Sequence, residues 1–143
     1  MTRYTNLREA LQRLALPAIK QAEWLDDFFS QLTDGKCAEA FGNEELVMGF
    51  GDIALARNHM MEFQELSANE AEIVAEVDSI IGSICDPSDS DFWERKALYE
   101  DPRWEQIRAV AKLTLAQLPD ERRESDWTRR NWGGGSSKAI PSS

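Results

Sequence analysis

The chain has 143 residues, of which 42% are hydrophobic and 29% are charged, and this size and composition indicate one globular domain. Its formal net charge of −10 at pH 7 disfavours direct binding to nucleic acid or to an anionic membrane. Two cysteines, Cys37 and Cys85, are too few for a disulfide framework and indicate a reducing, cytoplasmic environment. The apolar run at residues 14–19 is far below the roughly 20 residues of a membrane span.

The negative charge is concentrated in the middle of the chain. Residues 21–94 carry 18 acidic side chains against two basic ones, Lys36 and Arg57, whereas residues 1–20 and 95–143 each carry a net charge of +3. A field of one sign over the middle of the protein repels phosphates and attracts a basic partner. This asymmetry is the strongest functional signal in the sequence.

The N-terminal part predicts two helices joined near Pro17. Thr5 or Asn6 is a plausible cap for the first helix. Its inward face is predicted to comprise Leu7, Leu11, Leu14 and Ala15. The apolar side chains of the second helix are Ile19, Trp24, Leu25, Phe28, Phe29 and Leu32. Pro17 either ends the first helix or opens the second, and Gly35 closes the second.

A second pair of helices is expected between residues 43 and 66. Asn43 is a candidate cap for residues 44–48, and a short strand over residues 46–50 is the alternative. Gly49 and Gly51 predict a break or kink, with Asp52 as a new cap, because each interior glycine costs about 1 kcal/mol relative to alanine. The following helix, over about residues 53–66, is expected to turn these side chains inward: Ile53, Ala56, Met60, Met61 and Phe63.

The central helix is the clearest element. Ser67 and Glu70 have the spacing of a capping box. One apolar face is predicted for Ile73, Val74, Val77, Ile80, Ile81 and Ile84, and the opposite face carries Glu72 and Glu76.

Beyond a loop at residues 85–90, two further helices are expected. Ser90 or Asp91 is a candidate cap for a short helix containing Phe92, Trp93, Ala97, Leu98 and Tyr99. Asp101 and Pro102 then start a helix with an inward stripe, while Arg103, Arg108 and Lys112 stay outside. That stripe comprises Trp104, Ile107, Ala111, Leu115 and Leu118. The predicted fold is an all-α, single-domain bundle of six to seven helices over residues 1–132, followed by a disordered Gly/Ser-rich tail over residues 133–143.

Catalytic and metal-binding patterns are weak. His59 is the only histidine, and neither cysteine is flanked by a nucleophile motif, so no catalytic residue is assigned. With three Cys and His side chains in total, no structural zinc site is expected, and no cofactor is predicted. The stretch from Trp127 to Trp132 combines tryptophans with arginines, which suits nucleic acid, but packing on the bundle is the preferred interpretation.

The remaining candidate is a docking face for a basic protein. Its predicted residues are Glu62, Glu65, Glu70, Glu72, Glu76, Asp78, Asp86, Asp89 and Asp91. In charge and size the chain resembles small acidic helical proteins that neutralise basic partners, such as bacterial toxin-immunity proteins and nucleic-acid mimics. The leading hypothesis is therefore a non-enzymatic, cytoplasmic module that occludes a basic partner, such as a nuclease-like toxin. The alternatives are a helical structural or adaptor subunit, a merely solvated acidic surface, and an enzyme that uses the acids and His59.

Overall fold

The computed structural model describes residues 2–33 and 42–119, and within these ranges it contains seven α-helices, one 3₁₀-helix and no strand. The helices are α1 (Arg3–Ala15), α2 (Ala18–Thr33), α3 (Glu44–Ala54), α4 (Arg57–Glu62), α5 (Ala68–Ile84), η2 (Ser90–Trp93), α6 (Ala97–Glu100) and α7 (Pro102–Leu115). The prediction of an all-α fold is confirmed. The predicted closing residue Gly35, the stretch 120–132 and the tail at 133–143 lie outside the described residues.

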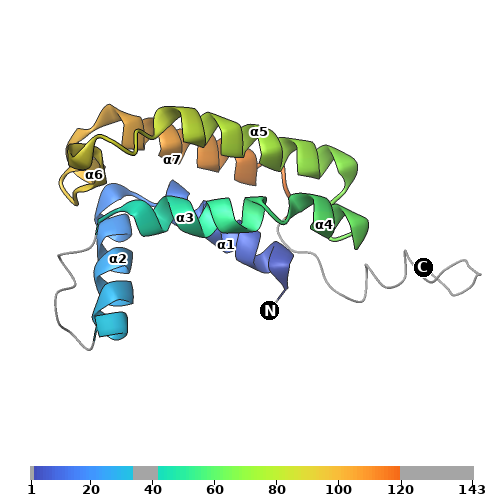
Figure 1. The fold of residues 1–143 in the computed structure, drawn as a ribbon, viewed down its shortest axis with the longest axis horizontal. Coiled ribbons are helices and arrows are strands. Elements are labelled where there is room, and N and C mark those ends of the chain that lie inside the picture. The colour runs from blue at the N-terminus through green and yellow to red at the C-terminus, as the bar shows by residue number, and fades with distance from the viewer. Residues whose placement is uncertain (1, 34–41, 120–143) are drawn as a thin grey trace, which may run out of the picture.

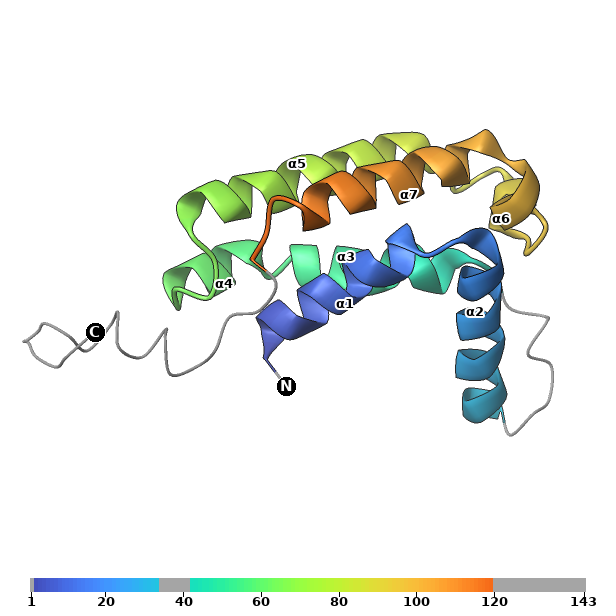
Figure 2. The ribbon, with the colours of Figure 1, turned by 180° about the vertical axis from the view of Figure 1, so that it is seen from behind.

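Four helices form the body of the molecule. Helix α1 packs against α3 and α7, and α5 packs against the same two helices, so the four close a ring around one core. They run in alternating directions in chain order (Figures 1 and 2). Helices α3 and α5 lie on the side seen in Figure 1, and α1 and α7 lie on the side seen in Figure 2. The short helices α4 and α6 lie at opposite ends.

Helix α1 begins earlier than the sequence predicts. The side chain of Thr2, not Thr5 or Asn6, caps it by accepting a hydrogen bond from the backbone N–H of Thr5. The predicted inward leucines Leu7, Leu11 and Leu14 are fully buried. Pro17 precedes α2 and its carbonyl accepts from the backbone of residues 20 and 21. Among the apolar side chains of α2, Leu25 is fully buried whereas Ile19 is 56% exposed.

The predicted break at the two glycines is wrong, because α3 continues through Gly49 and Gly51 to Ala54. Phe50 between them is buried, and its packing offsets the cost of the glycines. A Cβ at Gly49 would lie in ordinary van der Waals contact with the guanidinium of Arg13, at 3.4 Å, and a Cβ at Gly51 would meet nothing within 4 Å. Asp52 is therefore inside α3, and the alternative of a strand at residues 46–50 is also excluded.

The chain breaks instead around Leu55 and Ala56, and α4 is short. Met60 is buried, as predicted, but Met61 and Phe63 are 37% and 50% exposed, so their inward assignment is wrong. The helix ends at residue 62, and two residues later Gln64 has a φ of 60°. This turn leads the chain into α5. The prediction assumes one continuous helix over about residues 53–66, so it places the side chains beside the turn wrongly.

Replacing Gln64 with glycine is expected to stabilise the protein by about 0.5–1 kcal/mol. A left-handed backbone costs a residue with a Cβ about 1–2 kcal/mol, and glycine avoids this cost. Part of the gain is offset, because glycine gives the unfolded chain more conformational entropy to lose on folding. Urea denaturation followed by circular dichroism measures the change. Gln106→Gly, at an exposed position inside α7, is the control and should destabilise by a similar amount. A destabilised Gln64→Gly variant would contradict the prediction.

Helix α5 starts with the predicted capping box. The hydroxyl of Ser67 accepts from the backbone of Glu70, and the Glu70 carboxylate accepts from the backbone of Ser67. Val74, Val77 and Ile81 are buried, and Ile73 and Ile84 pack against them at the edge of the core. Ile80 is predicted on the same apolar face, but it is 38% exposed and is not part of the core, so its assignment to the core is wrong.

Helix α7 starts at Asp101 and Pro102, as predicted, and it buries Trp104, Ile107 and Ala111. The prediction for its arginines is wrong, since Arg103 and Arg108 are half-buried and bonded within the molecule. No helix in the described part of the chain has both the length and the apolar character that crossing a bilayer requires.

Candidate functional site

The two sides of the four-helix body carry opposite charge. Helices α3 and α5 together contain seven acidic residues and no lysine or arginine. Helices α1 and α7, on the other side, contain six basic residues and two acidic ones. The acid-rich helices α3 and α5 therefore lie on one side of the bundle and the base-rich helices α1 and α7 on the other (Figures 1 and 2).

The arginines of the α1 and α7 side are engaged within the molecule. Arg13 lies over the ring of Trp24 at 4.7 Å. The guanidinium of Arg108 donates to the side-chain oxygen of buried Gln21 at 2.8 Å. The others contact acids or carbonyls, namely Arg3 with Glu65, Arg8 with the Leu118 carbonyl, and Arg103 with Asp89 and Asp101. Lys112 alone among these six cations is exposed and has no such contact in the described part of the chain.

Four of the nine predicted docking residues have intramolecular roles, and one of them, Asp86, accepts from the backbone N–H and the hydroxyl of Ser88 at 3.0 and 2.7 Å. Glu65 accepts from the Nε of Arg3 at 2.9 Å, and this contact joins the start of α1 to the turn before α5. Glu70 is buried in the capping box. Asp89 contacts Arg103 at 2.8 Å and caps η2. Their carboxylates stabilise the fold. The role of Glu70 is predicted by its spacing to Ser67, whereas the partners of Glu65 and Asp89 are distant in the chain and no local pattern identifies them.

The five remaining acids and Asp86 differ in position. Glu72 and Glu76 are exposed on α5, and Asp78 is half-buried on the same helix. Glu62 is exposed at the end of α4, while Asp86 and Asp91 are exposed in the segment after α5. The α5 helix alone is about 25 Å long. The structure therefore distributes the predicted set along α5 and beyond both of its ends.

Sequence reasoning left two exposed acids of α3 out of the predicted set. Glu44 and Asp52 lie on the outward face of α3, next to α5, and neither makes an ion pair in the described residues. Their spacing of eight residues, with Met48 midway, is the signal that could have identified them. We call Glu44, Asp52, Glu72 and Glu76 the acidic side.

Apolar side chains are exposed among these acids. Met48 and Leu55 on α3 are 54% and 77% exposed, and Ile80 on α5 is 38% exposed. Carboxylates around exposed apolar side chains are the two components of a protein interface, since apolar anchors supply affinity and charges supply orientation and rate.

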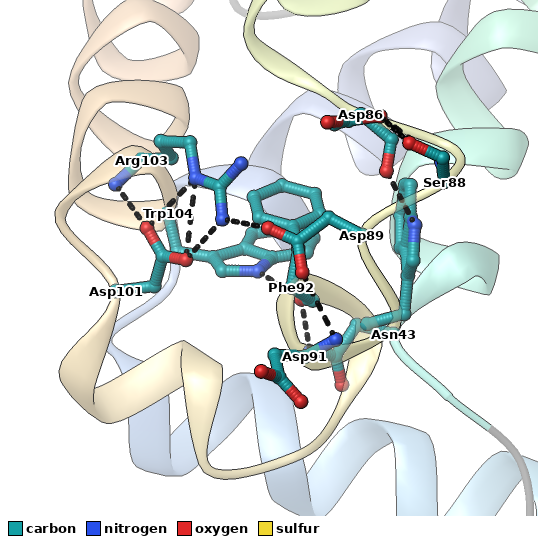
Figure 3. Close-up of polar contacts among 10 residues, drawn as sticks. Asn43, Asp86, Ser88, Asp89, Asp91, Phe92, Asp101, Arg103 and Trp104 are labelled. Carbon is teal, nitrogen blue, oxygen red and sulfur yellow. Dashed lines mark hydrogen bonds and ion pairs between the residues drawn. The ribbon is translucent and has the colours of Figure 1, made fainter.

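A second feature is the junction between α5 and α7, shown in Figure 3. The indole of Trp104 stacks on the ring of Phe92 with centroids 4.8 Å apart, and its Nε1 donates to the Phe92 carbonyl at 2.9 Å. The Arg103 guanidinium lies over the Phe92 ring, 4.6 Å from its centroid, and contacts both Asp89 and Asp101. Hydrogen bonds from Arg103 lower the pKa of Asp101, so this contact stabilises the fold at neutral pH and is lost on acidification through that lowered pKa.

Residues 42 and 43, which directly precede α3, contact this junction. The side-chain amide of buried Asn43 donates to the carbonyl of Glu94 at 2.6 Å and to that of Phe92 at 3.4 Å. Asn43 precedes α3 but makes no side-chain cap, contrary to the prediction. A Cβ on Gly42 would lie 2.5 Å from the Trp93 carbonyl, so only glycine permits this approach. The junction is therefore structural.

Cys85 lies at the start of the junction, half-buried, and burial raises the pKa of its thiol to about 11. At pH 8 the fraction of Cys85 present as thiolate is therefore about 100-fold smaller than for a free cysteine. We predict correspondingly slow alkylation of Cys85 by iodoacetamide, measured by peptide mass spectrometry so that Cys37 is scored separately. Unfolding in urea should restore the ordinary rate, and equal native and unfolded rates would contradict the prediction.

Neither a catalytic group nor a metal site emerges from the described residues. His59 is exposed, with its Nδ1 2.8 Å from the Arg3 guanidinium. Within residues 2–33 and 42–119 no three His, Cys, Asp or Glu side chains are arranged to hold a metal ion. An open depression of about 360 Å³ is lined by Asp91, Lys96, Ala97, Glu100, Asp101 and Pro102, a set without serine, cysteine or histidine.

Comparison with known proteins gives no family for this chain. No family model matches it, and neither a curated protein nor a solved structure matches it significantly. Its function is therefore inferred from the chain's own charges and contacts.

Proposed function

We propose that this protein is a non-enzymatic, cytoplasmic binding module whose acidic side docks on a basic protein and occludes it. The observation that supports the proposal is the separation of charge across the bundle, in which the arginines of α1 and α7 are bonded internally whereas Glu44, Asp52, Glu72 and Glu76 are exposed. Keeping like charges together on α3 and α5 costs stability through repulsion. A binding role gives a reason for that cost.

The proposed partner is a nuclease-like toxin or another nucleic-acid-binding protein. Such proteins present lysines and arginines where phosphates bind, and the carboxylates of the acidic side would occupy those positions. Met48, Leu55 and Ile80 would supply the apolar contacts that make the complex persist.

The double variant Glu72→Lys/Glu76→Lys is expected to slow association with a captured partner about tenfold or more at low salt, because charge steering raises association rates by about 10–10³-fold. The partner is captured from native lysate on the immobilised protein, and rates are then measured by stopped-flow at about 0.05 and 1 M salt. High salt should remove the difference, since the Debye length falls to about 3 Å at 1 M.

The matched control is Glu100→Lys/Glu105→Lys, which makes the same charge change at exposed residues of α6 and α7. This control should associate with the partner nearly as fast as the unmodified protein does. Equal rates for both double variants, or rates insensitive to salt, would overturn the acidic-side proposal and favour the structural or adaptor role.

A further inference from the structure

Exposed apolar side chains gather at the end of the bundle where α3 is followed by α4. Leu55, Met61 and Phe63 are 77%, 37% and 50% exposed, and the Phe63 ring contacts His59 edge-on at 4.8 Å. The exposed acids Asp52 and Glu62 lie in the same stretch and make no ion pair within the described residues. We call these five residues, Asp52, Leu55, Met61, Glu62 and Phe63, the α3–α4 corner. Three exposed apolar side chains within nine residues of the chain are the kind of feature that a partner or another segment covers.

The described chain ends close to this corner. The hydroxyl of Tyr4 donates to the carbonyl of Pro119 at 2.7 Å, which holds residue 119 against the first turn of α1. The adjacent Arg3 contacts His59 of α4 and Glu65 of the following turn. Figures 1 and 2 show the last described residues ending beside α4 and the start of α1.

The sequence that follows is complementary to the corner. Trp127 and Trp132 flank Arg129 and Arg130, with no acidic residue between the tryptophans. Seven residues lie between Pro119 and Trp127, and the eight Cα–Cα steps can span up to roughly 26–29 Å, whereas the whole of α4 is about 9 Å long. The tether is therefore long enough to bring either tryptophan onto the corner.

We propose that the α3–α4 corner is the binding surface for residues 127–132 of the same chain. The two indoles cover Leu55, Met61 and Phe63, and Arg129 and Arg130 pair with Asp52 and Glu62. Tethering keeps the effective concentration of the segment high, so a modest intrinsic affinity suffices. The corner shares Asp52 and Leu55 with the acidic-side proposal, so a segment bound there would leave Glu44, Glu72 and Glu76 to a partner. The two proposals are tested separately, because Glu72→Lys/Glu76→Lys changes no residue of the corner.

The test uses the indole N–H signals of the full-length, ¹⁵N-labelled protein, assigned by single Trp→Phe variants. In the unmodified protein we expect the signals of Trp127 and Trp132 to differ from their positions in urea. The double variants Leu55→Ser/Phe63→Ser and Arg129→Glu/Arg130→Glu should both move them to those positions. The signals of Trp24, Trp93 and Trp104 report that the bundle stays folded, and Arg129→Glu/Arg130→Glu changes no residue of the bundle.

The matched control is Ile19→Ser/Leu113→Ser, which removes two side chains that are 56% and 68% exposed on α2 and α7 and should leave both signals in place. Signals of Trp127 and Trp132 already at their urea positions in the unmodified protein would overturn the proposal. So would signals that respond equally to the control, or that shift with protein concentration, which would assign the corner to a second copy of the chain.

Discussion

Replacing Trp104 with alanine is expected to lower the free energy of unfolding by about 3–5 kcal/mol, the usual range for deleting a buried aromatic side chain. Trp104 is fully buried, stacks on Phe92 and meets the Trp93 ring at 6.3 Å. Its loss leaves a cavity between α7 and η2 and removes a donor from the Phe92 carbonyl. Urea denaturation monitored by circular dichroism measures the effect.

Two variants of α7 give the Trp104 measurement its controls. Trp104→Phe keeps most of the stacking but loses the hydrogen bond, so it should fall between the unmodified protein and Trp104→Ala. Leu113→Ala, at a 68% exposed position of the same helix, should change the stability by less than about 0.5 kcal/mol. A loss below about 1 kcal/mol for Trp104→Ala would mean that the junction is not packed as described.

Asn43→Leu is expected to cost about 2–4 kcal/mol, because leucine keeps the volume but removes more than one hydrogen bond, and each buried group left unpaired costs roughly 1–3 kcal/mol. The amide of Asn43 donates to the carbonyls of Phe92 and Glu94, and its oxygen accepts from Arg95. The same urea experiment measures the loss.

Asn58→Leu is the control for this substitution, since Asn58 is exposed on α4 and makes no side-chain hydrogen bond in the described part of the chain. It should leave the stability nearly unchanged. Asn43 and Trp104 also share the Phe92 carbonyl, so the double variant Asn43→Leu/Trp104→Phe should cost a different amount from the sum of the single variants. Strict additivity, or an Asn43→Leu variant as stable as the Asn58 control, would contradict the shared junction.

The sequence was sufficient where structure depends on neighbouring residues. The capping box of Ser67 and Glu70 and the start of α7 at Asp101 need only residues within one turn, and both are present as predicted. The wrong assignments arise where tertiary packing overrides local preference. Buried Phe50 keeps α3 helical between two glycines, and the turn at Gln64 leaves Phe63 exposed.

The residues of the candidate site also include some that the sequence predicts and some that depend on tertiary packing. The sequence correctly places Glu72 and Glu76 on the polar face of α5, because helical periodicity alone decides it. It could not show that Glu65 would contact Arg3, 62 residues away. It also could not show that α3 would lie next to α5 and bring Asp52 to the same side. Such neighbours follow only from how the helices assemble.

The closed ring of helices also has a consequence for synthesis. Helix α1 is made first, yet it packs more extensively against α7 than against α3, and the α7 residues are added about ninety positions later. At a synthesis rate of about 5–20 residues per second, α7 is added on the order of ten seconds after α1, and until then the leucines of α1 lack the helix that covers them most. Nascent chains stalled before residue 102 should therefore expose an uncovered apolar face and bind chaperones, whereas complete chains released from the ribosome should not.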